Sequence, residues 1–529
     1  MPPAARVLRR SAALLSLGLA LTLALALTLA LPARAQSIQL KLSGELPSVM
    51  PCPEGLPAGT ECRRGRDHLG AWIWMARPAG WNGKLVVHAH GGPELGDPSA
   101  ERSARDLQRW SVWLRAGWGW VGSSFRQGGV ELRAAADDTE RARQAFVGEY
   151  GEPAFTLLHG QSWGAGVAAS VAERFTTPDF HPRRPMSGRP PYSAVLLSSG
   201  VLGGGTRVYD VRLDLRVVYQ AVCRNHPRPD EPGYPLWMGY PLIAGKVQPM
   251  TRAQLAERVE ECTGLSRPAA QRSPAQQRAL DTITRVTTIP ESALLGHLAW
   301  ATWHFHDIVW RKLKGANPFG NEGVVYRGSG DARIDQALNA RVDRYRADPA
   351  ALEALAADTH PGGRIHRPVL TVHAVRDTVA FVELESQWRQ TMEEAGTAAN
   401  LLQVYSDHGE HSYLSDAAYL AAAKALEDWV RSSTRPNAAD VAAGCRALDP
   451  QWQPATGCRF LPDYQPKPLD ERVPPRRRGQ MADPPAPADA SAPALPAAAP
   501  NAALNAAANA DPREPRLPPA PQPISPLTR

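Results

Sequence analysis

Between about residues 38 and 435, short apolar runs alternate with stretches whose apolar residues recur at helical spacing. This alternation is typical of a mostly parallel sheet flanked by helices. We therefore predict an α/β fold with a mostly parallel central sheet. The expected strands are 71–76, 84–89, 119–123, 154–159, 194–199, 368–374 and 400–405. The expected helices are 100–115, 138–150, 165–175 and 416–431.

A long segment separates the strand expected at 194–199 from the one expected at 368–374. Insertions of this length usually carry function or form a subdomain. Its Leu, Trp and Ala positions look helical, most clearly over 292–313. We predict a mainly helical cap over 205–365, which divides the α/β core into 36–204 and 366–435.

Residues 292–313 also contain the histidine and aromatic side chains of the expected cap. His304 and His306 are two residues apart, so on a helix they point to different faces, and a packed amphipathic helix is favoured over a metal pair. The aromatic residues could line an apolar pocket, although such side chains more often belong to the core. They are Trp300, Trp303, Phe305 and Trp310.

The N-terminus has the features of an export signal. Arg6, Arg9 and Arg10 precede an apolar run over 11–31, which ends in Pro32 and the small-residue site Ala33-Arg34-Ala35. This pattern predicts a signal peptide over 1–35 and a secreted or periplasmic protein beginning at Gln36. In the alternative, the apolar run stays uncleaved and anchors the chain in the membrane.

The other end of the chain differs in composition from the centre. Residues 436–465 form an extension that carries two cysteines, and beyond residue 466 the chain is rich in Pro and Ala. Such a segment lacks the large apolar side chains needed to offset its ordering entropy, so 466–529 is predicted to be disordered. Within it, Arg476-Arg477-Arg478 is interpreted as a solvated charge run.

Charge excludes one class of partner. The formal net charge of the 529 residues is +7, but Arg6, Arg9, Arg10 and Arg34 lie in the expected signal peptide without an acidic residue. The remaining chain is nearly balanced and has no basic run interleaved with aromatic residues, so nucleic acid is not an expected partner.

The six cysteines all follow the expected cleavage site, which suits an oxidising compartment. Proximity in the chain suggests the pairs 52–62, 223–262 and 445–458, one of 15 possible pairings. None shows CxxC spacing, so a zinc site is not indicated.

Residues 160–164 read G-Q-S-W-G, a match to G-x-S-x-G, with an apolar run before it and small residues after it. In a sharp strand-to-helix turn the two glycines are needed because a Cβ would clash, and the serine is presented at a helix N-terminus. Ser162 is therefore the candidate nucleophile. A tight turn without catalysis remains the alternative.

An earlier strand leads into His90-Gly91-Gly92-Pro93. Acyl transfer builds negative charge on a carbonyl oxygen, which two backbone N–H groups can stabilise. Trp163 would provide one, and Gly91 or Gly92 the other. The alternative is an ordinary turn at a strand end.

An acid and a base follow in the required order. The strand at 368–374 runs into Asp377, and one strand later come His408 and His411. His411 would accept the proton of Ser162 while Asp377 fixes its tautomer. His411 is favoured over His408 because it lies closer to Tyr413 and to the next helix. Asp377 could alternatively cap a helix.

Together these motifs resemble the α/β-hydrolase superfamily over about residues 71–431. His90-Gly91-Gly92-Pro93 with Ser162-Trp163-Gly164 is similar to its proline iminopeptidase branch, from which the sequence departs at Glu94 and Gln161. No cysteine adjoins Ser162 or His411, so a tannase or feruloyl-esterase assignment is not supported.

The resemblance implies a Ser-Asp-His hydrolase that acts on a small ester or a short peptide through an acyl-enzyme, without a cofactor or metal. The alternatives are an aminopeptidase of the proline iminopeptidase type and a non-catalytic envelope protein that binds through this scaffold. An acidic residue in the cap that captures an α-amine would favour the aminopeptidase.

Overall fold

The computed structural model describes residues 45–176, 190–411, 413–452 and 457–476. In these residues nine strands form one sheet. In spatial order they are β1 (Glu45–Met50), β2 (Glu61–Arg66), β3 (Trp72–Arg77), β5 (Gly119–Ser123), β4 (Lys84–Ala89), β6 (Phe155–Gln161), β7 (Ala194–Ser198), β10 (Val369–Ala374) and β11 (Leu401–Ser406). The pairs from β1 to β5 are antiparallel, and those from β5 to β11 are parallel.

Counted from β2, the strands follow one another across the described sheet as 1-2-4-3-5-6-7-8, which is the order of the α/β-hydrolase fold. The predicted mostly parallel sheet and its fold class are thereby confirmed. Parallel pairing aligns the carboxyl ends of β4, β6, β7, β10 and β11 at one edge of the sheet. Ala89 pairs with Gly160, Gln161 with Ser198, and Ala374 with Ser406.

Strand side chains alternate between two apolar layers. One layer packs against α4 (Leu132–Tyr150), α5 (Trp163–Phe175) and α12 (Leu384–Glu394). The other packs against α2 (Ala100–Arg109), α3 (Val112–Arg115), α13 (Asp416–Ser432) and α14 (Ala438–Trp452). On β3, Ile73 and Met75 face the first layer while Trp74 and Ala76 face the second. Both faces of the sheet are therefore covered.

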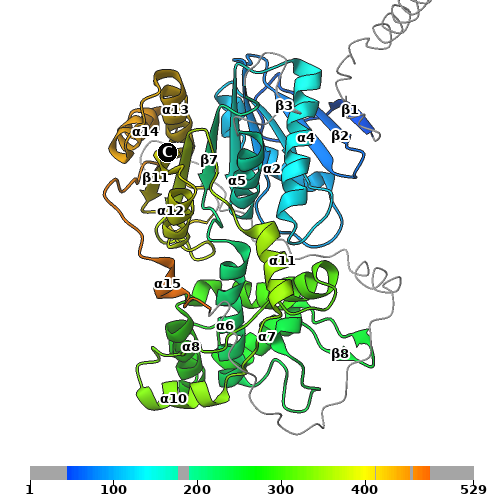
Figure 1. Cartoon of the computed structure of the whole chain (residues 1–529), viewed down its shortest axis with the longest axis vertical. Helices are drawn as coiled ribbons and strands as arrows, with labels where there is room; N and C mark the ends of the chain where they lie inside the picture. Colours follow the sequence, from blue (N-terminus) through cyan, green and yellow to red (C-terminus); the bar gives the residue numbers. More distant parts are fainter. Residues whose placement is uncertain (1–44, 177–189, 412, 453–456, 477–529) are drawn as a thin grey trace, which may run out of the picture.

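The segment between β7 and β10 forms a second lobe at the carboxyl edge of the sheet, below it in Figure 1. This segment is here called the cap. Its helices are α6 (Gly205–Cys223), α7 (Arg252–Thr263), α8 (Pro274–Thr287), α9 (Leu294–Ala299), α10 (Ala332–Arg341) and α11 (Pro349–Thr359). It also holds a small hairpin of β8 (Leu242–Ile243) and β9 (Lys246–Val247). Thr251 and Ser273 begin α7 and α8 with capping boxes, in which side chain and backbone satisfy each other's hydrogen bonds.

The helix predicted over 292–313 is not one continuous α-helix. The 3₁₀ turn Glu291–Ala293 leads into α9, which continues as the π-helical segments Trp300–His304 and Asp307–Lys312. Such widened turns are rare and occur frequently at functional sites. Further 3₁₀ turns lie at Leu236–Met238, Ala269–Gln271 and Ala398–Asn400.

Three disulfides join Cys52 to Cys62, Cys223 to Cys262 and Cys445 to Cys458, as chain proximity predicted. The second ties the end of α6 to α7 inside the cap. Within the described residues no helix combines the length and apolar character needed to cross a bilayer. The predicted signal peptide lies outside the described residues.

The prediction of disorder from residue 466 onward is wrong for residues 466–476, here called the C-terminal strap. It contains α15 (Leu469–Arg472) and runs from the core lobe to the cap (Figure 1). Leu469 and Val473 are buried. Arg476, interpreted as solvated, lies 2.8 Å from Asp214 and 3.5 Å from Asp210. The two buried carboxylates of α6 require a cation, which Arg476 of the strap provides. The composition of the strap itself gives no indication of this pairing.

We expect Arg476→Ala to lower the free energy of unfolding by about 3 kcal/mol, because it leaves Asp210 and Asp214 buried without their cation. Arg431 provides the control, since its ion pair with Asp428 on α13 is exposed, and Arg431→Ala should change stability by less than about 0.5 kcal/mol. Urea denaturation of both variants measures the difference, and equal effects would contradict a structural role for the strap.

Candidate active site

Ser162 occupies the turn between β6 and α5 with φ 58° and ψ −123°, a strained conformation for a residue with a side chain. Neighbouring glycines make this turn possible. A Cβ on Gly160 would lie 2.2 Å from the carbonyl oxygen of Gly164, and one on Gly164 would lie 2.2 Å from that of Ala89. Both contacts involve backbone that cannot move aside, so the motif is required by packing.

The end of β7 fixes the turn by two backbone hydrogen bonds. Ser162 N–H donates to Ser198 O at 2.9 Å, and Val201 N–H donates to Ser162 O at 3.1 Å. The strained backbone is thus held on both sides by the neighbouring strand, as such outliers must be if they are to persist.

The structure brings Ser162, His411 and Asp377 together from three segments of the chain. Ser162 Oγ lies 2.8 Å from His411 Nε2, and His411 Nδ1 lies 2.7 Å from Asp377 Oδ2. Asp377 Oδ1 accepts from the backbone N–H groups of Val379 and Ala380. Because the carboxylate can only accept, Nδ1 carries the proton and Nε2 is left to accept from the serine hydroxyl.

His408 lies elsewhere. Its Nδ1 contacts Ser406 Oγ and its side chain is buried. Burial lowers the pKa of His408. Of the two histidines considered from sequence, only His411 makes hydrogen bonds to both Ser162 and Asp377.

The glycine-rich loop after β4 lies against the nucleophile turn. A Cβ on Gly91 would lie 2.2 Å from Gln161 Oε1 and 3.0 Å from Gln161 O, and Gly92 has φ +75°. Trp163 is the first residue of α5, so its N–H belongs to the first turn, where helical N–H groups have no partner within the helix. The loop and the helix start therefore lie on the same side of Ser162.

A buried histidine supports the acid. His373 Nδ1 lies 3.0 Å from Glu385 Oε1 and Nε2 lies 2.7 Å from Ala380 O, so both ring nitrogens face acceptors. Burial alone would lower the pKa of His373, but Glu385 and Asp377 raise it above its ordinary value. His373 Nε2 also lies 3.8 Å from Asp377 Oδ2, so this buried ring lies against the side chain that hydrogen-bonds His411.

Glu94, a departure noted in the sequence, is partly exposed and forms ion pairs with its neighbours. Its carboxylate lies 2.7 Å from Arg102 and 3.3 Å from Arg105, with His90 Nε2 at 3.6 Å. Burial raises the pKa of Glu94, but His90 and Arg102 outweigh it and lower the pKa overall. The charge of Glu94 is therefore already compensated.

Two cap histidines reach the loops that carry the predicted site residues. His297 Nε2 lies 2.9 Å from Thr378 O, next to Asp377, and His304 Nε2 lies 2.9 Å from Pro93 O, next to Gly92. Burial lowers the pKa of His297 to about 3 and that of His304 to about 4. Sequence reasoning did not single out His297, since nothing in its helical pattern distinguishes it from a core histidine.

The remaining candidates in this helix are mostly core. His306 packs on Tyr240, away from His304, as expected for residues two apart. Phe305 is fully buried against Phe319, and the indole N–H of Trp303 donates to Met250 O. In the described residues, no group of three His, Cys, Asp or Glu side chains is positioned to hold a metal ion.

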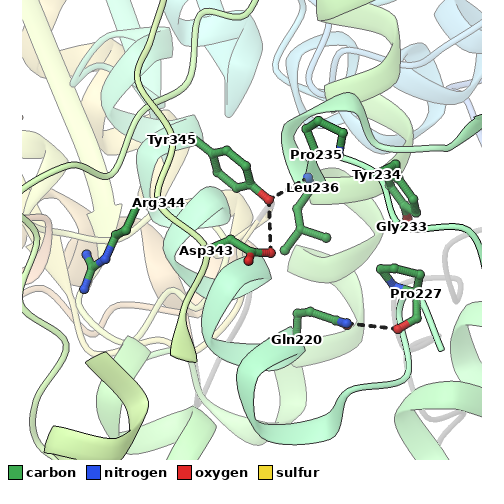
Figure 2. A pocket seen from close by; sticks show the side chains of 9 residues that line it. All are labelled: Gln220, Pro227, Gly233, Tyr234, Pro235, Leu236, Asp343, Arg344 and Tyr345. Carbon is green, nitrogen blue, oxygen red and sulfur yellow. Dashed lines mark hydrogen bonds between the residues drawn. The ribbon is translucent and has the colours of Figure 1, made fainter. Parts of the chain in front are cut away.

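Figure 2 shows a pocket of about 390 Å³ within the cap, where the Tyr345 hydroxyl contacts both Asp343 and the Leu236 backbone. None of the residues that line it is Ser162, Asp377 or His411. This pocket is therefore separate from the candidate active site.

No protein-family model matches this chain, and no curated protein matches it significantly in sequence. Solved structures similar to it include feruloyl esterase B from Aspergillus oryzae, at 10% identity over 74% of this chain and 88% of that one, with a TM-score of 0.37. Candida antarctica lipase A in its closed state is 12% identical over 76% of this chain and 89% of that one, with a TM-score of 0.36. A protein from Legionella pneumophila that is assigned as a hydrolase is 14% identical over 70% of this chain and 87% of that one, with a TM-score of 0.32. Identities and TM-scores this low say nothing about activity or substrate. The fold assignment rests on the strand order described above.

We expect the free energy of unfolding to fall as the pH is lowered from about 6.5 toward 4. Burial lowers the pKa of His88 and His304 to about 4 and that of His297 to about 3, below the unfolded value of about 6.5. In this window the unfolded chain binds more protons than the folded one, so stability is lost on acidification, by about 1.4 kcal/mol per pH unit and histidine at most. Urea denaturation at a series of pH values measures this slope.

Exposed His68 provides the control for that slope. His68→Asn should leave it unchanged between pH 6.5 and 5. A free energy of unfolding independent of pH in this range would contradict the neutral, buried state of the three histidines.

Proposed function

We propose that this chain is an exported serine hydrolase that cleaves a carboxylic ester through an acyl-enzyme, with Ser162 as nucleophile, His411 as general base and Asp377 as the orienting acid. The observation that carries the proposal is the hydrogen-bond chain from Ser162 Oγ to His411 Nε2 (2.8 Å) and from His411 Nδ1 to Asp377 (2.7 Å), at a strained turn held by glycine contacts. A turn with no role in chemistry would not need a strained serine aligned with a base.

In the proposed acylation step, Ser162 Oγ attacks the ester carbonyl while its proton moves to His411 Nε2. The tetrahedral intermediate collapses as His411 returns that proton to the leaving alcohol, and an acylated Ser162 remains. Water then attacks the acyl carbon with His411 again as base, which releases the acid and regenerates the serine. Asp377 stabilises the imidazolium formed in each half of the reaction.

The N–H of Trp163 and an N–H of Gly91 or Gly92 are the proposed donors to the oxyanion. Two features support this assignment. The glycine loop packs on Gln161, directly before the nucleophile, and Trp163 begins a helix whose dipole favours negative charge. Backbone donors of this kind are fixed before the reaction and need no reorganisation.

We favour an ester over an N-terminal peptide because the carboxylate that directly follows the glycine-rich loop, that of Glu94, is already compensated. Glu94 is paired with Arg102 and Arg105. The other alternative, a non-catalytic envelope binding protein, keeps the scaffold but has no need for the aligned hydrogen bonds. Export is proposed from the signal sequence pattern together with three disulfides, which form in oxidising compartments.

We expect a fluorophosphonate probe to label the purified protein beginning at residue 36, and we expect Ser162→Ala and His411→Ala each to abolish labelling. Hydrolysis of 4-nitrophenyl butyrate should fall by about 10³-fold or more in both variants. Labelling is read by in-gel fluorescence and hydrolysis by absorbance of the released nitrophenolate.

His408→Ala is the matched control, because His408 lies in the same loop but contacts Ser406 instead of Ser162. It should keep labelling and most of the turnover. If the folded, disulfide-intact parent neither labels nor turns over any ester or aminoacyl amide, the catalytic proposal fails and the binding-protein alternative gains.

A further inference from the structure

Arg212 on α6 is a buried cation without a carboxylate partner among the described residues. Its side chain is 1% exposed, and its only hydrogen bond within that part of the chain runs from Nη1 to Val208 O, on its own helix, at 2.6 Å. Its Nε is buried without a hydrogen-bond partner. An uncompensated buried charge is strongly destabilising, so this arrangement calls for an explanation.

The acids of α6 cannot compensate Arg212. Asp210 and Asp214 precede and follow it by two residues, which at 100° per residue turns them toward the opposite face of the helix. There they pair with Arg476 of the C-terminal strap. The helix thus has an acidic face that pairs with Arg476 and an opposite face that carries the unpaired Arg212.

Side-chain contacts connect Arg212 to the glycine-rich loop beside the candidate active site. Its guanidinium lies 4.2 Å from the ring centre of Trp300, and Trp300 packs on His304 with ring centres 5.0 Å apart. His304 contacts Pro93, at the end of the glycine-rich loop. Arg212 also acts electrostatically on His297, which in turn interacts with Asp377 and His411.

His297 and His304 add two hydrogen-bond acceptors to the part of the cap that contains Arg212. Each donates from Nε2 to a backbone carbonyl, so in the neutral ring Nδ1 is left as an acceptor, and both Nδ1 atoms are buried without a partner in the described residues. The acid near His304 is not free, since Asp307 is bound by Arg311 at 2.6 Å. The cap therefore offers a cation with polar acceptors, and no unpaired carboxylate is seen beside it in the described residues.

Burial lowers the pKa of Arg212 to about 10, so the guanidinium stays charged at neutral pH. A guanidinium binds carboxylates through two parallel hydrogen bonds, and stacking on an aromatic ring holds its plane in place. A carboxylate on the substrate would supply the missing counter-charge.

We infer that Arg212 is a specificity-determining residue that binds a carboxylate on the substrate, so that the natural substrates are anionic esters, such as half-esters of dicarboxylic acids. This inference rests on the proposed hydrolase function and names its substrate class. It also gives a reason for the cap to carry a cation where an aminopeptidase would need an acid.

The test compares each anionic ester with its own neutral methyl ester. One pair, 4-nitrophenyl hemiglutarate and 4-nitrophenyl methyl glutarate, carries the charge in the acid part. The other, 3-carboxyphenyl butyrate and its methyl ester, carries it in the alcohol part. For the wild-type protein we expect kcat/KM to favour the anion by about 10- to 100-fold in one of the two pairs.

Arg212→Gln should reduce that ratio by about the same factor, and Arg212→Lys should give an intermediate ratio because it keeps the charge but loses the planar fork. Arg216→Gln is the matched control. Arg216 is a fully buried arginine one turn further along α6, whose guanidinium is bonded to His226 O and Tyr234 Oη. It should keep the wild-type ratio whatever its effect on stability.

A measurement on the wild-type protein alone keeps the test independent of how the variants fold. Glutarate should slow labelling of Ser162 by the fluorophosphonate probe, whereas dimethyl glutarate should not.

Wild-type ratios of kcat/KM near or below one in both ester pairs would overturn the anion site while leaving the hydrolase function intact. Labelling without turnover of any of the four esters, and without protection by glutarate, would overturn it equally. Absence of both labelling and turnover would instead remove the proposed function, and this inference with it.

Discussion

The close approach of the β6–α5 turn to the end of β4 is the constraint on which the candidate site depends. Gly164 lies so near the carbonyl oxygens of Ala89 and His90 that no side chain fits between them. That contact aligns the start of α5 with the glycine-rich loop and sets Ser162 above the sheet edge. The strain of its backbone is balanced by hydrogen bonds to the end of β7. Without this contact, the loop that follows β4 and the helix start that follows β6 would not converge.

Around that turn, compensation of buried charge organises the second lobe. The sheet and its helices are held by apolar layers, but α6 enters the cap carrying acids on one face and Arg212 on the other. The acids are neutralised by Arg476, which draws the C-terminal strap across from the core lobe. The same ion pairs therefore contribute both to the stability of the cap and to the ordering of the strap. The unpaired cation on the other face is linked through Trp300 and His304 to the glycine-rich loop, and in the inference drawn above a ligand rather than the chain compensates it.

Sequence pattern predicted the central strands well because buried parallel strands are short apolar runs, and seven such runs became β3 to β7, β10 and β11 within a residue or two. It missed β1 and β2, which contain a proline, three arginines and a glycine instead of a continuous apolar run; β2 pairs with the edge of β3, and β1 pairs with β2. It also missed α14, an alanine-rich helix fixed by packing on the second apolar layer and by the disulfide from Cys445. The resemblance to the proline iminopeptidase branch stays a prediction.

By itself, the sequence determined the fold class and the order of the candidate site residues, because these follow from local periodicity and motif spacing. Proximity only suggested the disulfide pairing, one of 15, and the structure contains that pairing. Only the tertiary structure decided which of His408 and His411 meets Ser162, since both lie in one loop and differ only in where the chain turns. It likewise decided that Arg476 pairs with Asp210 and Asp214 and that Arg212 lacks a carboxylate partner among the described residues. Partners of buried charges come from distant parts of the chain, and a linear pattern contains no record of them.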